Sequence, residues 1–272
     1  MLIDYHIHSE FSPDSSARIS DIAAAAVLEG LSEVAITDHL DLHPGGVFNW
    51  GGNTDFEGFF SELEKVREIY EGELVIRAGI EIGNAFFDPD KADGVINNYP
   101  FDYVLASVHD PTDIELFTMD FTKCDLQEVK KVYLSEMAKV VDWGNFDCLA
   151  HFDLPVRYAA LAGIDLDFGD FSEKIEGMLT RLLEYGNKGL ELNLSGYMNK
   201  TQKPLPSRNI LEMWQRMGGR IVTIGTDSHG CKTVGKFAQE GQELLLSCGF
   251  TQFATFEKRE PILNEIEWKE WE

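Results

Sequence analysis

Short apolar runs alternate along the chain with longer stretches in which apolar residues recur at helical spacing. The apolar runs predict strands at 2–8, 33–37, 74–80, 102–108, 147–150, 189–193 and 220–225. The amphipathic stretches predict helices near 20–29, 54–70, 125–142, 172–186, 207–217 and 232–247. Alternation of this kind is typical of a parallel sheet whose strands are joined by right-handed crossovers, so the pattern predicts an α/β fold.

Capping signals mark the start of two predicted helices. Thr54 and Glu57 are spaced as a capping box, and Asp125 and Glu128 form a related pair. A further strand-like run at 250–256 precedes a polar tail. The segment 195–208 lacks a hydrophobic period, and we interpret it as a functional loop over one end of the sheet.

Histidines and acids gather where the predicted strands end. Six of the seven histidines follow a predicted strand in this way, and acids accompany them. The residues concerned are His6, His8, His39, Glu81, His109, His151, Asp227 and His229. In an α/β barrel the carboxyl ends of the strands form the reactive face, and imidazoles mixed with carboxylates are typical ligands of divalent metals. The pattern therefore predicts a metalloenzyme.

The wide distribution of these candidates also bears on the architecture. An open doubly wound sheet is an alternative, but it would concentrate its ligands at one crevice instead of recruiting them from nearly every strand. We therefore favour a closed or nearly closed barrel. No break in composition divides the chain, so we expect one domain over residues 1–272.

The spacing of two pairs indicates which residues share a metal ion. His6 and His8 lie two apart on a strand, so both side chains point to one face and can hold the same ion. Asp227 and His229 repeat this spacing at the last barrel strand, which closes next to the first.

A carboxylate can join two ions where an imidazole cannot. Glu81 has two oxygens with which to bridge, and His109 and His151 are placed to complete a second ion. Two metals that share a carboxylate are a recurrent device for hydrolysing phosphate esters.

Composition limits the partners of the protein. The formal net charge is −24, from 47 acids against 23 lysines and arginines, which disfavours nucleic acid and anionic membranes as partners. The four cysteines form no C-x-x-C pair and are expected to be reduced. No apolar run is long enough for a membrane span, and the first motif begins at His6, so we expect a cytoplasmic protein without a leader. The oligomeric state stays open.

Six motifs, in order, resemble those of the PHP (polymerase and histidinol phosphatase) superfamily: HIHSEFSPDS, ITDH, GIE, SVHD, AHFD and TDSH. The resemblance covers essentially the whole chain. Three further features are similar to PHP-type histidinol-phosphate phosphatases: H-x-D-x-x-x-R-Y at 151–158, the run E-L-N-x-S-G, and the segment CGFTQFATFEKREP.

The resemblance implies a distorted (β/α)7 TIM-like barrel that holds three divalent metal ions (zinc, iron or manganese). Carried over to this sequence, the ligands would be His6, His8, Glu81 and Asp227 for the first ion, Glu81, His109 and His151 for the second, and Asp14, His39 and His229 for the third. The implied activity is hydrolysis of L-histidinol phosphate to L-histidinol and phosphate, a step of histidine biosynthesis. A hydroxide that bridges two metal ions would be the nucleophile.

Several residues are candidates for contacts with this small phosphorylated substrate. Arg157 follows His151 on the same side of the barrel, and its guanidinium matches phosphate oxygens in a bidentate fashion. Asp41 or His43, just past His39, would protonate the leaving alkoxide. Asp38 is a candidate to orient an imidazole.

The second phosphate contact departs from the family pattern. Many relatives have an arginine in S-G-x-R, where this chain has Met198. Lys200, Lys203 and Arg208 of the same loop are candidate replacements.

Three alternative functions remain. A phosphoesterase of the same superfamily could act on another small ester or a nucleotide, although the charge of −24 argues against a polynucleotide. A non-catalytic metal-binding or docking domain would lack ligands, and none is missing from the motifs. An amide hydrolase of a related barrel would usually have a lysine in the bridging position that Glu81 occupies.

Overall fold

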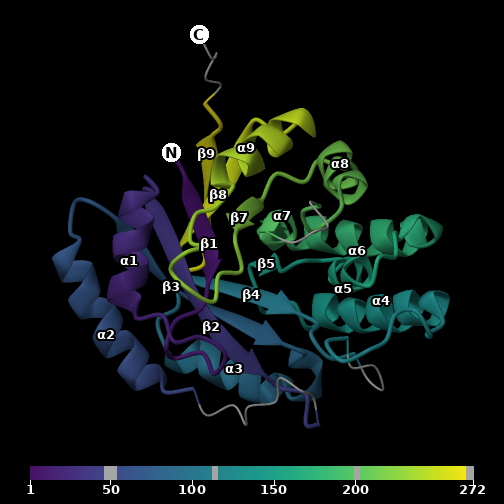
Figure 1. Ribbon diagram of the computed structural model, residues 1–272, viewed down its shortest axis with the longest axis horizontal. Helices are drawn as coiled ribbons and strands as arrows, with labels where there is room; N and C mark the ends of the chain where they lie inside the picture. The colour runs from purple at the N-terminus through teal and green to yellow at the C-terminus, as the bar shows by residue number, and fades with distance from the viewer. Residues whose placement is uncertain (46–53, 112–115, 199–202, 268–272) are drawn as a thin grey trace.

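The computed structural model describes residues 1–45, 54–111, 116–198 and 203–267. Its centre is one sheet of seven parallel strands that follow each other in sequence order (Figure 1). They are β1 (Ile3–Ile7), β2 (Glu33–Asp41), β3 (Val75–Gly83), β4 (Tyr103–Ser107), β5 (Cys148–Leu149), β6 (Gly189–Asn193) and β7 (Val222–Gly225). The prediction of an α/β fold is confirmed.

The two outer strands approach each other, so the sheet is a nearly closed barrel, as predicted. The seam is formed just beyond β7, where His8 N donates to Ser228 O over 2.8 Å and Ser228 N donates to His6 O over 3.2 Å. Asp4 strengthens the seam, because its carboxylate accepts from Thr226 N and Thr226 Oγ1 at 2.9 and 2.6 Å. The loop after β7 is thereby fixed against β1.

Helices surround the sheet: α1 (Ile19–Leu28), α2 (Phe56–Ile69), α3 (Pro89–Asn98), α4 (Leu126–Trp143), α5 (Pro155–Leu161), α6 (Ser172–Tyr185), α7 (Ser195–Met198), α8 (Arg208–Arg216) and α9 (Ala238–Ser247), with 3-10 turns η1 (Ala85–Phe87) and η2 (Gly169–Phe171). Figure 1 shows α1 and α2 on one side and α4 to α6 on the other. In the described part of the chain, no helix is both long and apolar enough to cross a membrane.

A separate antiparallel hairpin closes the amino-terminal end of the barrel. Strand β8 (Gln252–Glu257) pairs with β9 (Glu260–Glu265), and Figure 1 shows this hairpin beside the start of β1. Phe256 packs on Tyr103 with ring centroids 5.0 Å apart, and Phe256 N donates to Tyr5 Oη over 3.0 Å. These aromatic side chains fill the amino-terminal end of the barrel. The histidines and acids of the predicted metal site occupy the carboxyl-terminal end.

Several element boundaries differ from the prediction. The helix expected from residue 54 begins at Phe56, because Asp55 is its N-cap and accepts from Gly58 N over 2.9 Å. Thr54 Oγ1 instead donates to His39 O over 2.9 Å, so the predicted capping box is wrong. The helix expected from 232 begins at Ala238.

Two strands extend further than predicted, which matters for the site. β2 runs to Asp41 and β3 to Gly83, so the polar residues at 39, 41 and 81 lie within strands and not beyond them. Their positions are therefore fixed by the parallel ladder, which pairs His39 with Glu81 and Asp41 with Gly83.

Candidate metal centre

Glu81 lies at the centre of a buried cluster of histidines. Its Oε2 is 3.1 Å from His6 Nε2 and 3.1 Å from His39 Nδ1. Its Oε1 is 3.0 Å from both His109 Nε2 and His151 Nε2. The two oxygens of one carboxylate thus face different pairs of imidazoles, which is the arrangement expected of a bridging ligand.

The first strand and the loop after β7 complete one side of this cluster. His6 Nε2 and His8 Nε2 are 3.1 Å apart. Asp227 Oδ1 lies 3.6 Å from the first of these nitrogens and 3.4 Å from the second. The structure therefore brings His6, His8, Glu81 and Asp227 together, as the sequence analysis expected.

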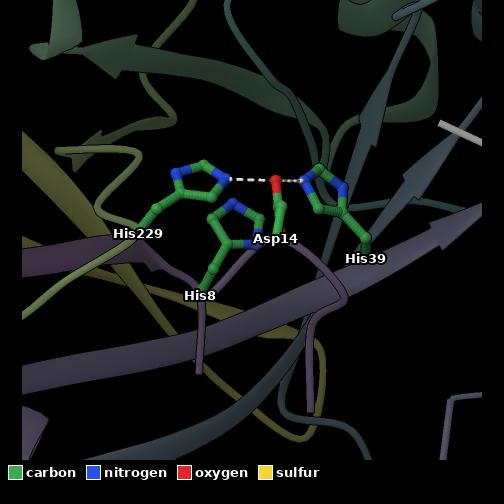
Figure 2. A group of neighbouring side chains, drawn as sticks. All are labelled: His8, Asp14, His39 and His229. Carbon is green, nitrogen blue, oxygen red and sulfur yellow. Dashed lines mark ion pairs between the residues drawn. The ribbon is translucent and has the colours of Figure 1, made fainter. Parts of the chain in front are cut away.

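A further group lies nearer the surface. Asp14 Oδ2 is 2.7 Å from His229 Nε2 and 3.5 Å from His39 Nε2, and Figure 2 shows this oxygen between the two rings. The His8 ring stacks on His39 and on His229, with centroids 4.2 Å apart in each case. The side chains of Asp14 and His229 are 25% and 35% exposed, so this group is the accessible part of the centre.

The donor sets fit divalent metals. Among the residues that the structure describes, four groups of acids and histidines have ligand atoms that all lie within 4.8 Å of one another: His8, Asp14, His39 and His229; His6, His8 and Glu81; His39, Asp41 and His109; and Glu81, His109 and His151. Imidazole nitrogens and carboxylate oxygens are suitable ligands for zinc and its neighbours. Two ring nitrogens that face each other at 3.1 Å, as in His6 and His8, are well explained by a cation between them.

The electrostatics differ among the candidate ligands: burial opposes the charge of His6 and His109, but the neighbouring carboxylates raise the pKa of both rings, so a metal would displace protons from them. Burial opposes ionisation of Glu81, but the charges of His109 and His6 outweigh it and hold its pKa well below the usual range. Burial and the neighbouring His39 and His229 lower the pKa of His8 to about 3. At neutral pH the carboxylate is therefore charged, and the His8 ring has a nitrogen lone pair for a metal.

Asp41 contacts two of these histidines from behind. Its Oδ1 is 2.7 Å from His109 Nδ1, and its Oδ2 is 3.2 Å from His39 Nδ1. Burial opposes its charge, but His109 and His39 lower its pKa, which favours the ionised, accepting form. Gly83 leaves room for this contact, because a Cβ there would lie 1.8 Å from Asp41 Oδ1.

Two other candidates, Asp38 within β2 and His43 just beyond it, have different surroundings. Asp38 accepts from Ser9 N and Ser9 Oγ, both at 2.6 Å, and so fixes the turn after His8. His43 packs edge-on against Phe87, with ring centroids 4.4 Å apart.

The candidate phosphate ligands are distributed differently. Arg157 Nη1 donates to Asp227 Oδ2 over 2.7 Å and to Ser195 Oγ over 2.8 Å, so Arg157 touches the cluster directly. Lys203 pairs with Asp165 over 2.6 Å. Arg208 pairs over 2.7 Å with Glu212, its neighbour on α8. Lys200 lies outside the described residues.

The backbone is strained at two candidate ligands. His151 and Asp227 have φ angles of 26° and 57°. Residues other than glycine rarely adopt such positive φ angles. The N–H of His151 donates to Glu191 Oε2 over 2.8 Å. The sequence analysis assigned no role to Glu191, although it begins the E-L-N-x-S-G run that was noted there.

Comparisons with known proteins agree with this geometry. A family model described as PHP domain matches residues 4–195. Histidinol-phosphatase of Lactococcus lactis is 30% identical over 260 residues, which cover 93% of this chain and 94% of that protein. A probable histidinol-phosphatase of Thermotoga maritima is 31% identical over 258 residues, or 95% of this chain and 97% of that one.

A solved structure is similar over nearly the full length. It is the crystal structure of histidinol phosphate phosphatase from Lactococcus lactis in complex with zinc, L-histidinol and phosphate. The TM-score is 0.84 at 27% identity, and the match covers 96% of this chain and 98% of that chain.

Proposed function

Because the chain belongs to the PHP domain family, we propose that it hydrolyses L-histidinol phosphate to L-histidinol and phosphate, a step of histidine biosynthesis. The chain is a phosphoric monoester hydrolase that binds divalent metals. We further propose that L-histidinol phosphate is the substrate, and that three metal ions are held by the ligand sets that the family resemblance implies.

The central observation is the position of Glu81, whose two oxygens face separate pairs of histidines at 3.0–3.1 Å. This favours two ions that share Glu81, and the accessible group around Asp14 and His229 favours a third. The Lactococcus lactis phosphatase structure, which contains zinc, L-histidinol and phosphate, supports the choice of substrate.

The reaction needs an activated water and a site for the phosphoryl charge. Divalent ions bound here would lower the pKa of a water and offset negative charge on the phosphoryl oxygens. Arg157 is proposed to bind a phosphoryl oxygen, since Ser195 and Asp227 orient its guanidinium through Nη1. Its contact with Asp227 places that cation next to the proposed ligands.

The leaving alkoxide needs a proton. Asp41 is ionised and accepts from His109 and His39, so we assign it to holding these rings. His43, two residues further along the same segment, is the proposed proton donor.

The proposal is tested by phosphate release from a panel of L-histidinol phosphate, nucleoside monophosphates and single-stranded DNA, with the zinc-loaded protein. We expect the highest kcat/KM for L-histidinol phosphate. A higher kcat/KM for a nucleotide would replace this substrate by the alternative of another small phosphate ester.

A further inference from the structure

Three polar residues at and just beyond the end of β6 form a row inside the barrel, and all three are buried: Glu191, Asn193 and Ser195. Glu191 and Asn193 lie two apart on β6 and so share one face of the strand. Ser195 is the first residue of α7, and its N–H and its hydroxyl both donate to Asn193 Oδ1. They are the polar positions of the E-L-N-x-S-G run, which the proposed mechanism uses only through the contact of Ser195 with Arg157.

The row is continuous from the proposed phosphate ligand to a proposed metal ligand. Arg157 Nη1 donates to Ser195 Oγ over 2.8 Å, and Ser195 Oγ donates to Asn193 Oδ1 over 2.5 Å. Asn193 Nδ2 donates to Glu191 Oε2 over 3.1 Å. Glu191 Oε1 lies 2.6 Å from His6 Nδ1.

The donors and acceptors of this row permit only one direction of hydrogen-bond donation, from Arg157 toward Glu191. A guanidinium only donates, so Ser195 Oγ accepts from Arg157 and its own proton is directed to Asn193 Oδ1. This orients the amide of Asn193 with its nitrogen toward Glu191. The carboxylate of Glu191 accepts the Nδ1–H of His6, which leaves Nε2 of that ring with a lone pair for a metal.

The row closes into a ring. Arg157 Nη1 also donates to Asp227 Oδ2 over 2.7 Å, and Asp227 Oδ1 lies 3.6 Å from His6 Nε2. Glu191 adds a branch, because its Oε2 accepts the N–H of His151 at the strained backbone position. The row is thus hydrogen-bonded to a residue of each ligand set that shares Glu81, through the His6 side chain and through the His151 backbone.

We propose that Glu191, Asn193 and Ser195 are positioning residues that couple the phosphate-binding arginine to the metal-binding His6 and His151. The inference rests on the proposed function in one respect, namely that Arg157 binds the phosphoryl group. A disturbance anywhere along the row changes both phosphate and metal affinity, although the middle residue, Asn193, contacts neither Arg157 nor His6 in the bonds above.

The first test compares two buried serines. Ser195→Ala removes a hydroxyl of the row, and Ser107→Ala, the matched control, removes a buried hydroxyl at the end of β4 that has no hydrogen bond in the described part of the chain. Calorimetric titration of the zinc-loaded proteins with inorganic phosphate is expected to give a Kd about fivefold higher for Ser195→Ala. Ser107→Ala and Ser195→Thr, which keeps a hydroxyl, are expected to stay near the wild-type Kd.

The second test follows the row to the metal. Glu191→Gln is expected to weaken zinc binding about tenfold in competition with a chelator, because the amide cannot accept from His6 and His151 at once. It is also expected to raise the Kd of inorganic phosphate, and the effects of Glu191→Gln and Ser195→Ala on that Kd are expected to be non-additive.

The outcomes separate this inference from the proposed substrate. If Ser195→Ala binds phosphate as tightly as Ser107→Ala, or if the two effects add, the positioning role is wrong whatever the substrate. If the phosphate and zinc affinities change as expected but L-histidinol phosphate is not hydrolysed, the substrate is wrong and the positioning role stands. Failure of the wild-type protein to bind phosphate would overturn both.

Discussion

The two ends of the barrel differ in which groups neutralise their buried acids. At the amino-terminal end, individual acids are paired with arginines. Arg259 Nε and Nη2 lie 2.9–3.1 Å from the carboxylate of Asp147, and Arg77 Nε lies 2.7 Å from Glu33. The charges there are neutralised by the chain itself.

At the carboxyl-terminal end, acids share histidines. One carboxylate, Glu81, faces four imidazoles at 3.0–3.1 Å, and the cation in contact with the cluster, Arg157, approaches it through Asp227. An imidazole is charged only when it is protonated, and its neutral form binds metal ions well. An arginine is always charged and does not bind metal ions. The comparison indicates that the first end is built for stability and the second for cations supplied from outside.

The largest effect is expected for Glu81→Gln, compared with Glu33→Gln at the opposite end. Loss of the bridging charge should lower kcat/KM about a thousandfold and reduce zinc content. Glu33→Gln should keep zinc and activity but lower the free energy of unfolding by about 2 kcal/mol, since Arg77 loses the shorter of its two carboxylate contacts and keeps only the exposed Glu257. Metal analysis and urea denaturation measure the two effects, and full zinc content in Glu81→Gln would remove the distinction between the ends.

A smaller loss is expected for Arg157→Ala. The variant should lose about a hundredfold in kcat/KM, because one donor to the phosphoryl group is removed. Zinc content at saturating zinc should change little, and zinc affinity should fall less than in Glu191→Gln, because Arg157 contacts the metal ligands only through Asp227 and the row. Steady-state kinetics and metal analysis check this. Loss of zinc in parallel with activity would show that Arg157 supports the metal ligands through Asp227 more than it binds substrate.

At the other end, Arg259→Ala is expected to act on stability alone. The buried carboxylate of Asp147 would lose its closest cation and keep only Lys188, which lies 3.9 Å away, so the free energy of unfolding should fall by about 2 kcal/mol. Arg181→Ala, which removes an exposed pair with Glu184, is the control and should change the free energy of unfolding much less than Arg259→Ala. Equal losses in the two variants, or reduced kcat in Arg259→Ala, would contradict the assignment of this end to stability.

The smallest expected effect is a change with pH in the stability difference between the wild type and Arg259→Ala. Burial raises the pKa of Asp147 above 3.8, and Arg259 counteracts this rise. An acid with a raised pKa in the folded state costs stability as pH rises through that pKa, so the cost grows when Arg259 is absent. The stability difference between the wild type and Arg259→Ala should therefore shrink by about 1 kcal/mol from pH 7 to pH 4. A pH-independent difference in urea denaturation would show that Asp147 keeps its charge state without Arg259.

The sequence predicted those parts of the fold well that depend on local chemistry, namely most of the strands and the cap of helix α4. The apolar runs gave the seven barrel strands in order, and Asp125 is the expected N-cap of α4, accepting from Gln127 N and Glu128 N. Helix α3 was missed because its sequence, PDKADGVINN, is mostly polar and has only Ala92 and Ile96 among its buried residues. Strand β9 was missed because none of its residues is fully buried, and its sequence, EPILNE, has only two adjacent apolar residues, Ile262 and Leu263, beside Pro261.

The site was predictable as far as it follows strand ends. His6, His8 and Glu81 could be grouped because spacing and strand order bring them to one face. The contact of His6 with Glu191 spans 185 positions in sequence and crosses the barrel, so no local pattern indicates it. The same holds for Asp41, whose contact with His109 depends on the space that Gly83 leaves.

The ladder between β2 and β3 pairs His39 with Glu81, so the geometry of the cluster depends on the register of these two strands. A slip of one residue between these strands would turn every side chain of one strand to the opposite face and separate this pair. An ion that binds the native cluster lowers the free energy of the aligned sheet and leaves the slipped ones without that gain. A metal ion bound to Glu81 and His39 would therefore stabilise the register of the sheet as well as supply the chemistry of the site.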